Sequence, residues 1–393
     1  MVTNLYAASN QWANRPADER FWTLEDMFDR TNGYAVSACQ ATAKMGDLIV
    51  EPTPSNDLTL RGSKGAQAKL TNWAFRQLAT RVSAPAGYLA SLPAPVAATC
   101  LNTGLDRFNK DNEDTRLLFH NQPETGLVCR SLTSENYSRI WNRDIVKRLL
   151  DLPEQGWQVP PARPMFRGEC DMDNTRLATE EDCLKLRGGM LSIKPGDVIG
   201  PAGLYASDHD MFAFLVNEQV IDDGTDCGLG RGVFVSNSEV GKAAFKVVKF
   251  LYAYVCANHI VWDAKEIKEL KIVHRGSANS RFGSQMSIEL RNYSDQSSSV
   301  EEARIKMCKR VEIGGNKDEV LDKIFGKKTL GLTKGVIGEA YDHAVQNEHI
   351  YKTSPRSIWG MVQGVTAVSR KLPHADDRAT LDKAAGKMMT IDF

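Results

Sequence analysis

The sequence predicts an α+β fold, in which a mixed or antiparallel sheet core carries helices and a helical C-terminal part follows. Between residues 190 and 237, short apolar runs alternate with Pro-Gly and Asp-Asp-Gly turns, a pattern typical of strands. From about residue 300 onward, segments with helical periodicity and helix start signals follow one another. A chain of 393 residues is long enough for one large domain or two ordinary ones.

Residues 1–150 are expected to form an N-terminal module of helices and strands. The apolar residues of the segment 70–82, LTNWAFRQLATRV, have helical spacing. The segment 126–134, GLVCRSLTS, is typical of a strand. The next segment, 142–152, predicts a helix with Asn142 as its N-cap.

Residues 151–290 are expected to form a strand-rich core that contains a long basic helix at 237–257. Ser236 to Glu239 match the Ser-x-x-Glu capping box, in which the two side chains satisfy free N–H groups of a helix's first turn. The strand 232–235 is therefore expected to turn directly into the helix. The apolar side chains expected to be buried along this helix are Val248, Leu251 and Val255.

The same helix is expected to carry a row of lysines. Lys242, Lys246 and Lys249 are spaced by four and three residues, which places them on one face of a helix. Such a row can bind a polyanion, or it can be an ordinary solvated face of an amphipathic helix. Both interpretations remain open at this point.

Residues 300–393 are expected to form a helical C-terminal region that packs on the core rather than standing alone. The segment 292–303, NYSDQSSSVEEA, is rich in serine and predicts a loop that leads into the first of these helices.

Composition places the chain among soluble globular proteins, with 42% hydrophobic and 25% charged residues. No apolar run reaches the roughly 18 residues of a membrane span. The N-terminus lacks a basic region followed by an apolar one, so we expect no secretory signal. The eight cysteines are scattered without a Cys-x-x-Cys pair, which favours free thiols in a reducing cytoplasm. No cofactor is expected.

The formal net charge is zero, but the charge is uneven along the chain. Residues 151–230 hold 15 acidic and 6 basic side chains, a net charge of −9. Residues 231–290 hold 5 acidic and 9 basic ones, a net charge of +4. This asymmetry is compatible with chance or with a surface that has one face suited to an anion.

Several blocks, in order from about residue 20 to residue 390, resemble the phage and plasmid family catalogued as domain of unknown function 932. They include NSEVGKAAFKVVKFLYAYVCAN, RSLTSENYSRIWNRDIV and SIWGMVQGVTAVSRK. The chain departs from the family pattern at Thr133, where leucine is common, and at Gln363-Gly364, where Asn-Ala is more usual. The resemblance implies a mobile-element protein in the host cytoplasm, but it supplies no established activity.

The basic residues predict a nucleic-acid-binding protein. Arg275 and Arg281 are expected in a glycine-bearing loop, 274–284, that can present guanidinium groups to phosphates. A second patch combines basic and aromatic side chains that suit stacking on unpaired bases, although the aromatic ones can equally be core residues. The members of that patch are Arg130, Arg139, Arg143, Tyr137 and Trp141.

We therefore expect a protein that binds or anneals single-stranded DNA in replication or recombination. Mixed sheets crossed by a basic helix also occur in strand-annealing proteins, which is an analogy of fold alone. Proteins of this kind often act as oligomers, so a homo-oligomer is expected.

Two alternatives remain. One is a metal-dependent nuclease in which Asp208, Asp210 and Asp222 hold a divalent ion, although acidic turns that flank a strand are the commoner explanation of such residues. The other is a protein-binding factor, such as an inhibitor of host defence, which suits the zero net charge. No Walker, Gly-x-Ser-x-Gly or His-Glu-x-x-His motif is present, so an enzyme is less expected than a binding protein.

Overall fold

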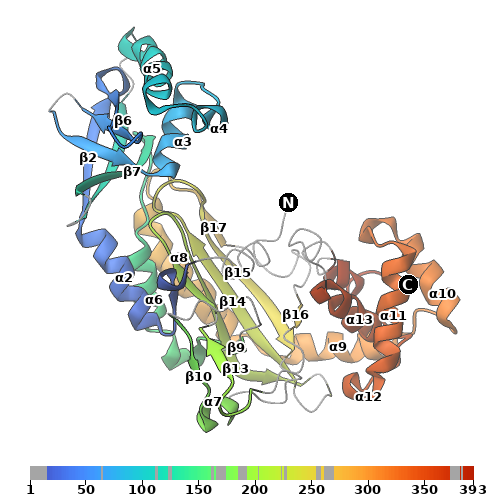
Figure 1. Ribbon diagram of the computed structural model, residues 1–393. Coiled ribbons are helices and arrows are strands. Elements are labelled where there is room, and N and C mark those ends of the chain that lie inside the picture. The colour runs from blue at the N-terminus through green and yellow to red at the C-terminus, as the bar shows by residue number, and fades with distance from the viewer. Residues whose placement is uncertain are drawn as a thin grey trace.

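The protein has three parts arranged along one long antiparallel sheet, as Figure 1 shows. The computed structural model describes residues 16–62, 65–110, 114–122, 126–160, 163–164, 174–184, 193–201, 203–222, 224, 228–253, 258–260, 270–371, 381 and 384–393. The fold is α+β, with antiparallel sheets followed by a helical C-terminal region, as the sequence predicts.

The N-terminal module is a six-stranded sheet covered by short helices. The strand order is β2-β6-β7-β5-β4-β3, and all neighbours are antiparallel except β5 and β7. Its strands are β2 (Ala38–Lys44), β3 (Ile49–Pro52), β4 (Leu58–Arg61), β5 (Gln67–Leu70), β6 (Asp114–Gln122) and β7 (Gly126–Ser134). Its helices are α3 (Asn72–Arg81), α4 (Ala86–Leu89) and α5 (Ala94–Leu105). Strand β7 and helix α3 confirm the predicted elements.

The central sheet is built on three long strands that pair in sequence order, β13 (Met211–Ile221), β14 (Leu229–Asn237) and β15 (Phe245–Ala253). Shorter strands extend it, namely β1 (Arg20–Phe21), β8 (Trp157–Gln158), β12 (Leu204–Ala206), β16 (Asn258–Ile260) and β17 (Leu270–Ile272). A separate small sheet contains β9 (Arg163–Pro164), β10 (Arg176–Leu177) and β11 (Val198–Gly200), next to α7 (Glu180–Leu184).

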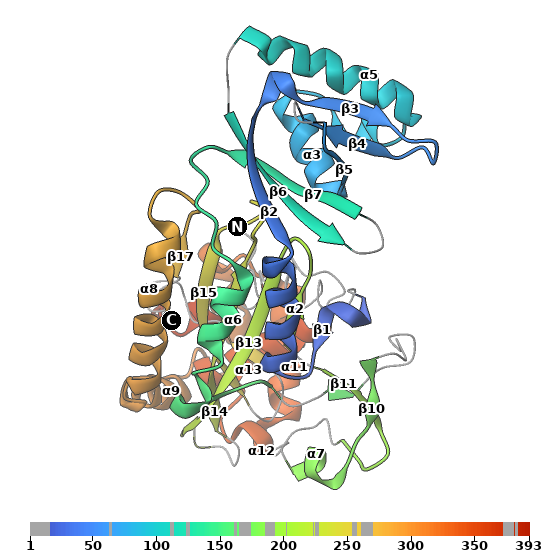
Figure 2. The ribbon, with the colours of Figure 1, turned by 90° about the vertical axis from the view of Figure 1, so that its left-hand side faces the viewer.

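Three helices cover one face of the central sheet, as Figure 2 shows. They are α2 (Leu24–Val36), α6 (Asn142–Leu149) and α8 (Ala278–Asp295). Their buried side chains share one core with Leu215, Val233 and Phe245 of the sheet. Because α2 and α6 belong to the first 150 residues yet pack on the central sheet, the expected domain boundary at 150 does not separate two cores.

The C-terminal helices are α9 (Ser299–Arg310), α10 (Lys317–Gly326), α11 (Lys334–Gln346), α12 (Glu348–Tyr351) and α13 (Ile358–Lys371). Their core includes Ile221, Leu229 and Leu251, which lie at one end of the three long strands. The helical region therefore packs on the end of the central sheet. A buried ion pair joins the two parts, with Arg231 Nη2 at 3.6 Å from Glu301 Oε1.

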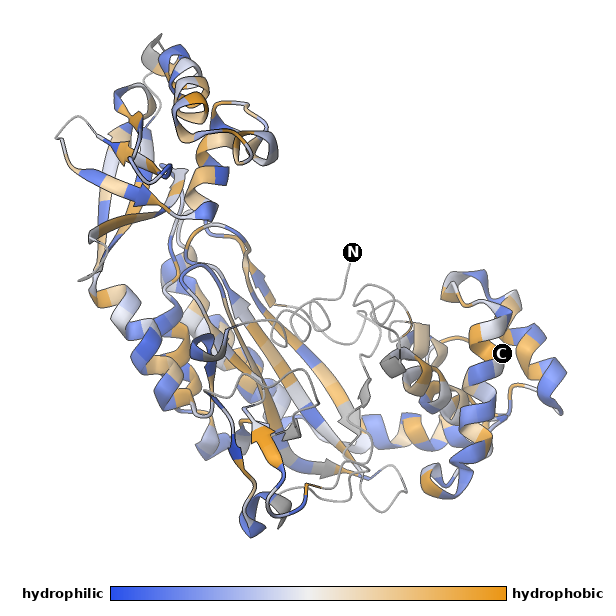
Figure 3. Ribbon diagram, in the orientation of Figure 1, coloured by the Kyte–Doolittle hydropathy of each residue, from blue (hydrophilic) through white to orange (hydrophobic). Residues whose placement is uncertain are grey.

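The predicted helix 237–257 is wrong, since this segment holds the end of β14, a turn and β15. The strands β14 and β15 are apolar along much of their length, as Figure 3 shows. Apolar side chains pack on both faces of β15, with Phe245 and Val247 on one side and Phe250 on the other. Apolar residues therefore occur at neighbouring positions and the alternation typical of a half-buried strand is lost. Leu251 is buried as expected, Val248 is half-buried, and Val255 lies outside the described residues.

Two other local predictions need correction. The segment 274–284 is not a loop, because α8 begins at Ala278 and runs through what the sequence indicated as the start of the serine-rich loop. Helix α6 is present, but Trp141 is its N-cap and Asn142 is its first residue. Within the described residues, no helix combines the length and the apolar character needed to cross a membrane.

Candidate nucleic-acid interface

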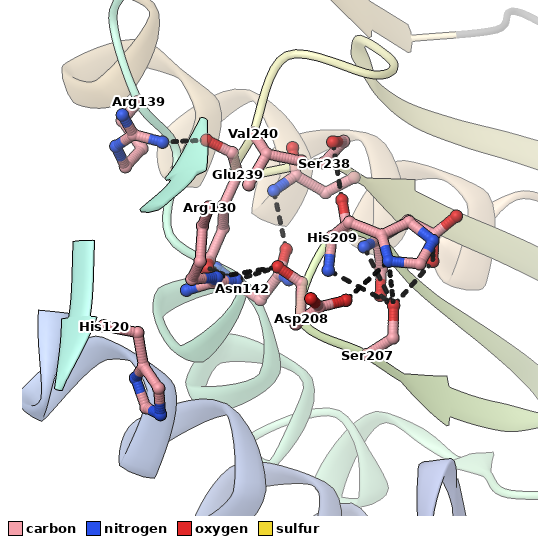
Figure 4. A network of polar contacts seen from close by, with 12 residues as sticks. His120, Arg130, Arg139, Asn142, Ser207, Asp208, His209, Ser238, Glu239 and Val240 are labelled. Carbon is pink, nitrogen blue, oxygen red and sulfur yellow. Dashed lines mark hydrogen bonds and ion pairs between the residues drawn. The ribbon is translucent and has the colours of Figure 1, made fainter. Parts of the chain in front are cut away.

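The turn between β14 and β15 is fixed by a buried polar network, drawn in Figure 4. The Glu239 carboxylate accepts hydrogen bonds from Arg130 Nη2 at 3.1 Å and from the Asn142 backbone N–H at 2.7 Å. The side chains of Arg130 and Glu239 are only 2% and 1% exposed. Arg130 also donates through Nε to the Asp208 carbonyl oxygen at 2.8 Å. Glu239 therefore serves as the partner of a buried arginine, not as half of a helix capping box.

The turn is also held by the N-terminal module. Trp73 and Gln77 of α3 both donate to the Val240 carbonyl oxygen, at 3.0 and 2.7 Å. Arg139 donates to the Glu239 carbonyl oxygen. Burial lowers the pKa of Arg139 to about 10, because the neighbouring Tyr137 and Glu239 offset only part of the cost of removing its charge from water. The network thus joins the module to the central sheet.

Tyr137 is part of the same junction. Its ring stacks on His274, with centroids 5.0 Å apart, and its hydroxyl donates to the Ser238 carbonyl oxygen at 3.0 Å. Arg139 lies over the Tyr137 ring and is only 7% exposed. The predicted patch of Arg130, Arg139 and Tyr137 is therefore packing at a junction, which leaves these side chains poorly placed to contact a nucleic acid.

The lysine row does not form. Lys246 and Lys249 are three residues apart on a strand, so they point to opposite faces of the sheet. Lys249 donates to Glu289 of α8 at 2.9 Å, and Lys242 donates from the turn to Asp210 at 2.8 Å. Two of the three charges are therefore compensated by carboxylates, and the three side chains share no face.

The three aspartates of the nuclease alternative are not brought together. Asp208 and Asp210 lie in the turn before β13, whereas Asp222 follows the last residue of β13. Eleven strand residues at about 3.3 Å each separate these ends by roughly 36 Å. The Asp222 carboxylate accepts from the Gly224 N–H at 2.8 Å, as in an ordinary acidic turn. Within the described residues, no group of three acidic, histidine or cysteine side chains is placed to hold a metal ion.

The turn Ser207–Asp210 contains serine, histidine and aspartate but lacks the geometry of a catalytic triad. Asp208 and Ser207 both approach the same ring nitrogen of His209, Nδ1, at 2.6 and 3.3 Å. The Ser207 hydroxyl donates to the Asp210 carboxylate at 2.9 Å instead. A triad requires the aspartate and the serine on opposite ring nitrogens, so this turn offers no activated nucleophile.

A different set of basic residues lies together on the surface around α8. We call it the α8 strip, and its members are Arg116, Arg148, Arg275, Arg281 and Arg291. All five side chains are exposed. Among the residues that the structure describes, none of the five forms an ion pair with a carboxylate.

Contacts between β6, α6, α8 and the chain around Tyr137 hold the strip together. Arg116 of β6 donates to the Tyr137 carbonyl oxygen at 3.2 Å, and Tyr137 forms a backbone bridge with Arg275, just before α8. Arg148 of α6 lies against Gly283, where a Cβ would overlap its guanidinium group. Arg148 also lies over the Phe282 ring, at 5.6 Å from its centroid. Figure 2 shows α6 and α8 side by side below the N-terminal module.

The exposed face of α8 suits phosphates. Around Arg281 and Arg291 it presents hydroxyl groups, and the carboxylate of Glu289 forms an ion pair with Lys249. The exposed serines of this face are Ser280, Ser284 and Ser287. Guanidinium and hydroxyl groups are among the groups that contact phosphate oxygens in nucleic-acid complexes.

Sequence reasoning identified Arg275 and Arg281 but missed Arg116, Arg148 and Arg291. Arg148 could have been found, because it lies in the predicted helix 142–152 next to Lys147, in a basic last turn. Arg116 and Arg291 carry no local signal, since only the tertiary fold places them near the start and along the exposed face of α8.

No known family model, curated protein or solved structure matches this chain. The resemblance to domain of unknown function 932 therefore stays a prediction, and the α8 strip has to be interpreted from its own geometry.

Proposed function

We propose that the protein binds single-stranded nucleic acid, with the phosphates running along the α8 strip. The observation that carries the proposal is the set of five exposed arginines, joined by contacts and lacking carboxylate partners in the described part of the chain. On the resemblance stated above, the expected setting is replication or recombination of a phage or plasmid.

The shape of the strip favours one strand over a duplex. Helix α8 has 18 residues and is therefore about 27 Å long. Three members of the strip, Arg275, Arg281 and Arg291, follow one another along α8 and the residues just before it. A single line of this kind fits one phosphate chain, whereas a duplex presents two chains on either side of a groove about 12 Å wide. Its length suits the lower end of the roughly 4–16 nucleotides that small single-strand sites cover.

The test is the salt dependence of binding, measured by fluorescence anisotropy with a labelled oligothymidylate. Each phosphate neutralised on a single strand contributes about −0.7 to the slope of log affinity against log salt. The variant Arg275→Gln/Arg281→Gln/Arg291→Gln is expected to flatten the slope by roughly 2 and to weaken binding of all sequences alike. Unlabelled duplex of the same length should compete poorly.

Two controls keep the test specific. Lys69→Gln/Arg76→Gln/Arg107→Gln removes the same charge from the exposed surface of the N-terminal module and should leave the slope unchanged. Lys242→Gln/Lys249→Gln should also leave it unchanged, since both lysines already have carboxylate partners. If the α8 variant binds like the wild type, or the wild type binds no oligonucleotide, the proposal is wrong. Magnesium-dependent cleavage that Asp210→Asn abolishes would favour the nuclease alternative instead.

A further inference from the structure

A second basic surface lies in the C-terminal helices, at the turn between α10 and α11. Residues 323–334 contain Lys323, Lys327, Lys328 and Lys334 and no acidic residue. The turn is well packed underneath, because Ile324 and Leu330 are buried in the core of this region. The lysines are thus presented by a fixed scaffold.

The structure adds a fifth lysine and an aromatic ring to this turn. Lys328 Nζ lies 3.7 Å from the centroid of the Phe325 ring, and Lys334 Nζ lies 5.4 Å from it. Lys387 donates to the Thr329 carbonyl oxygen at 3.3 Å. We call this surface the lysine corner, and its members are Lys323, Lys327, Lys328, Lys334 and Lys387.

Little negative charge offsets the lysine corner. Lys334 forms an ion pair with Asp322, with Nζ to Oδ1 at 2.7 Å. Among the described residues, the other four lysines have no carboxylate partner. Like charges that share one surface repel one another in the free protein, so a polyanion that binds here relieves repulsion as well as gaining attraction.

The chemistry of the corner favours a phosphate backbone over an acidic protein surface. Stable protein interfaces usually centre on a large apolar or aromatic anchor. The aromatic ring of the corner, Phe325, is half-buried against the core of this region and so is not a free anchor. The exposed large hydrophobic side chains of the described residues do not lie in the corner, the nearest in sequence being Val311 and Val345. Lysines act as point charges that suit sequence-independent contacts with phosphates.

The lysine corner is remote from the α8 strip. In Figure 1, α8 lies at one side of the central sheet and α10 at the far side of the C-terminal helices. A short oligonucleotide that follows α8 therefore cannot reach the corner. We propose that the lysine corner binds a second stretch of single-stranded nucleic acid, so that one molecule holds two strands at once. This inference rests on the proposed function of the α8 strip and extends it from binding to bridging.

The experiment counts oligonucleotides per chain. An eight-nucleotide oligothymidylate is titrated into the protein and the stoichiometry is measured by native mass spectrometry, with light scattering to count the chains. The wild type is expected to bind two oligonucleotides per chain. Lys327→Gln/Lys328→Gln/Lys387→Gln should bind one, and the α8 variant should also bind one.

A capture assay tests bridging directly. A bead-bound oligothymidylate is mixed with protein and a fluorescent oligothymidylate, which cannot pair with each other. The wild type should retain fluorescence on the beads, and the lysine-corner variant should retain at least fivefold less while still binding to the beads itself. The control Lys306→Gln/Lys317→Gln/Arg310→Gln removes the same charge elsewhere in the C-terminal helices and should behave like the wild type.

The outcomes separate the two proposals. If the wild type binds one oligonucleotide per chain, and only the α8 variant loses it, the inference is overturned and the proposed function stands. If only the lysine-corner variant loses binding, the corner binds nucleic acid but the α8 strip does not. If a polyglutamate peptide binds the corner while the oligonucleotide stoichiometry stays at one, the partner is an acidic protein and the inference is overturned.

Discussion

Replacing Glu239 by glutamine should strongly destabilise the junction between the N-terminal module and the central sheet. The amide oxygen of the introduced glutamine can keep the hydrogen bond from the Asn142 N–H, which is 2.7 Å long in the wild type. The amide nitrogen then faces Arg130 Nη2, which lies 3.1 Å from the carboxylate oxygen that it replaces. A donor thus meets a donor, and Arg130 loses its carboxylate.

The magnitude follows from the burial of the pair. Both side chains are at most 2% exposed, so water cannot take over the role of the missing carboxylate. Removing one partner of such a pair costs about 3–5 kcal/mol. Arg130 retains the Asp208 carbonyl oxygen as an acceptor, which favours the lower end, about 3 kcal/mol. That is a large part of the roughly 5–15 kcal/mol by which a typical domain is stable.

Urea unfolding followed by tryptophan fluorescence measures the effect, because Trp73 donates to the Val240 carbonyl oxygen at this junction. Glu312→Gln is the matched control. It breaks an ion pair with Arg356 whose side chains are 38% and 39% exposed, and such exposed pairs are worth at most about 1 kcal/mol. Adding Arg130→Met to Glu239→Gln should recover part of the loss, since no buried charge is then left without a partner.

If Glu239→Gln unfolds at the same urea concentration as the Glu312→Gln control, the buried ion pair does not stabilise the junction. If the double variant is less stable than Glu239→Gln alone, the cost comes from lost packing rather than from an uncompensated charge.

Two further predictions concern stability. Burial lowers the pKa of His274 from 6.5 to about 4, so the folded protein keeps the ring neutral while the unfolded chain takes up a proton below pH 6.5. The free energy of unfolding should therefore fall by up to about 3 kcal/mol between pH 6.5 and 4, and comparing pH-dependent melting of the wild type with His274→Gln, which lacks this contribution, tests it. Gly364→Ala in α13 should destabilise by about 1–3 kcal/mol, because a Cβ there would overlap the Ala340 carbonyl oxygen of α11. Gly338→Ala in α11 should instead stabilise the protein by about 0.5–1 kcal/mol, since the added Cβ would meet only Leu321 at 3.9 Å. Thermal melting measures both variants. Melting temperatures that shift in the same direction for the two would contradict this contrast.

The sequence alone determined the fold class and the elements whose local pattern has one interpretation. Helix α3 was predictable because its apolar residues repeat at helical spacing behind Thr71, which caps it. Strand β7 was predictable from its β-branched and apolar residues. Helices α10 and α11 were predictable because Asn316 and Thr333 cap their first turns and their apolar residues repeat at helical spacing.

The tertiary structure alone decided the segment 237–257. Strand β15 has apolar residues on both faces, and its two lysines are spaced by three residues, so its pattern does not show the period of two that would distinguish it from a helix. Pairing with β14 on one side and with β16 and β17 on the other supplies hydrogen bonds to the β15 backbone that a helix would have to make internally. The Ser-x-x-Glu motif was misleading because the partner of Glu239 is Arg130, 109 residues earlier in the chain.

For the candidate site, too, the sequence indicates some features and only the tertiary structure decides others. Sequence could indicate that Arg275 and Arg281 are basic residues with small hydroxyl residues between them, since that is a local property. It could not indicate which cations have partners, because Asp210 and Glu289 are 32 and 40 residues away from the lysines that they neutralise. The sequence shows which side chains are charged. Whether a lysine or arginine has an ion-pair partner depends on which carboxylates the fold brings within a few ångströms of it.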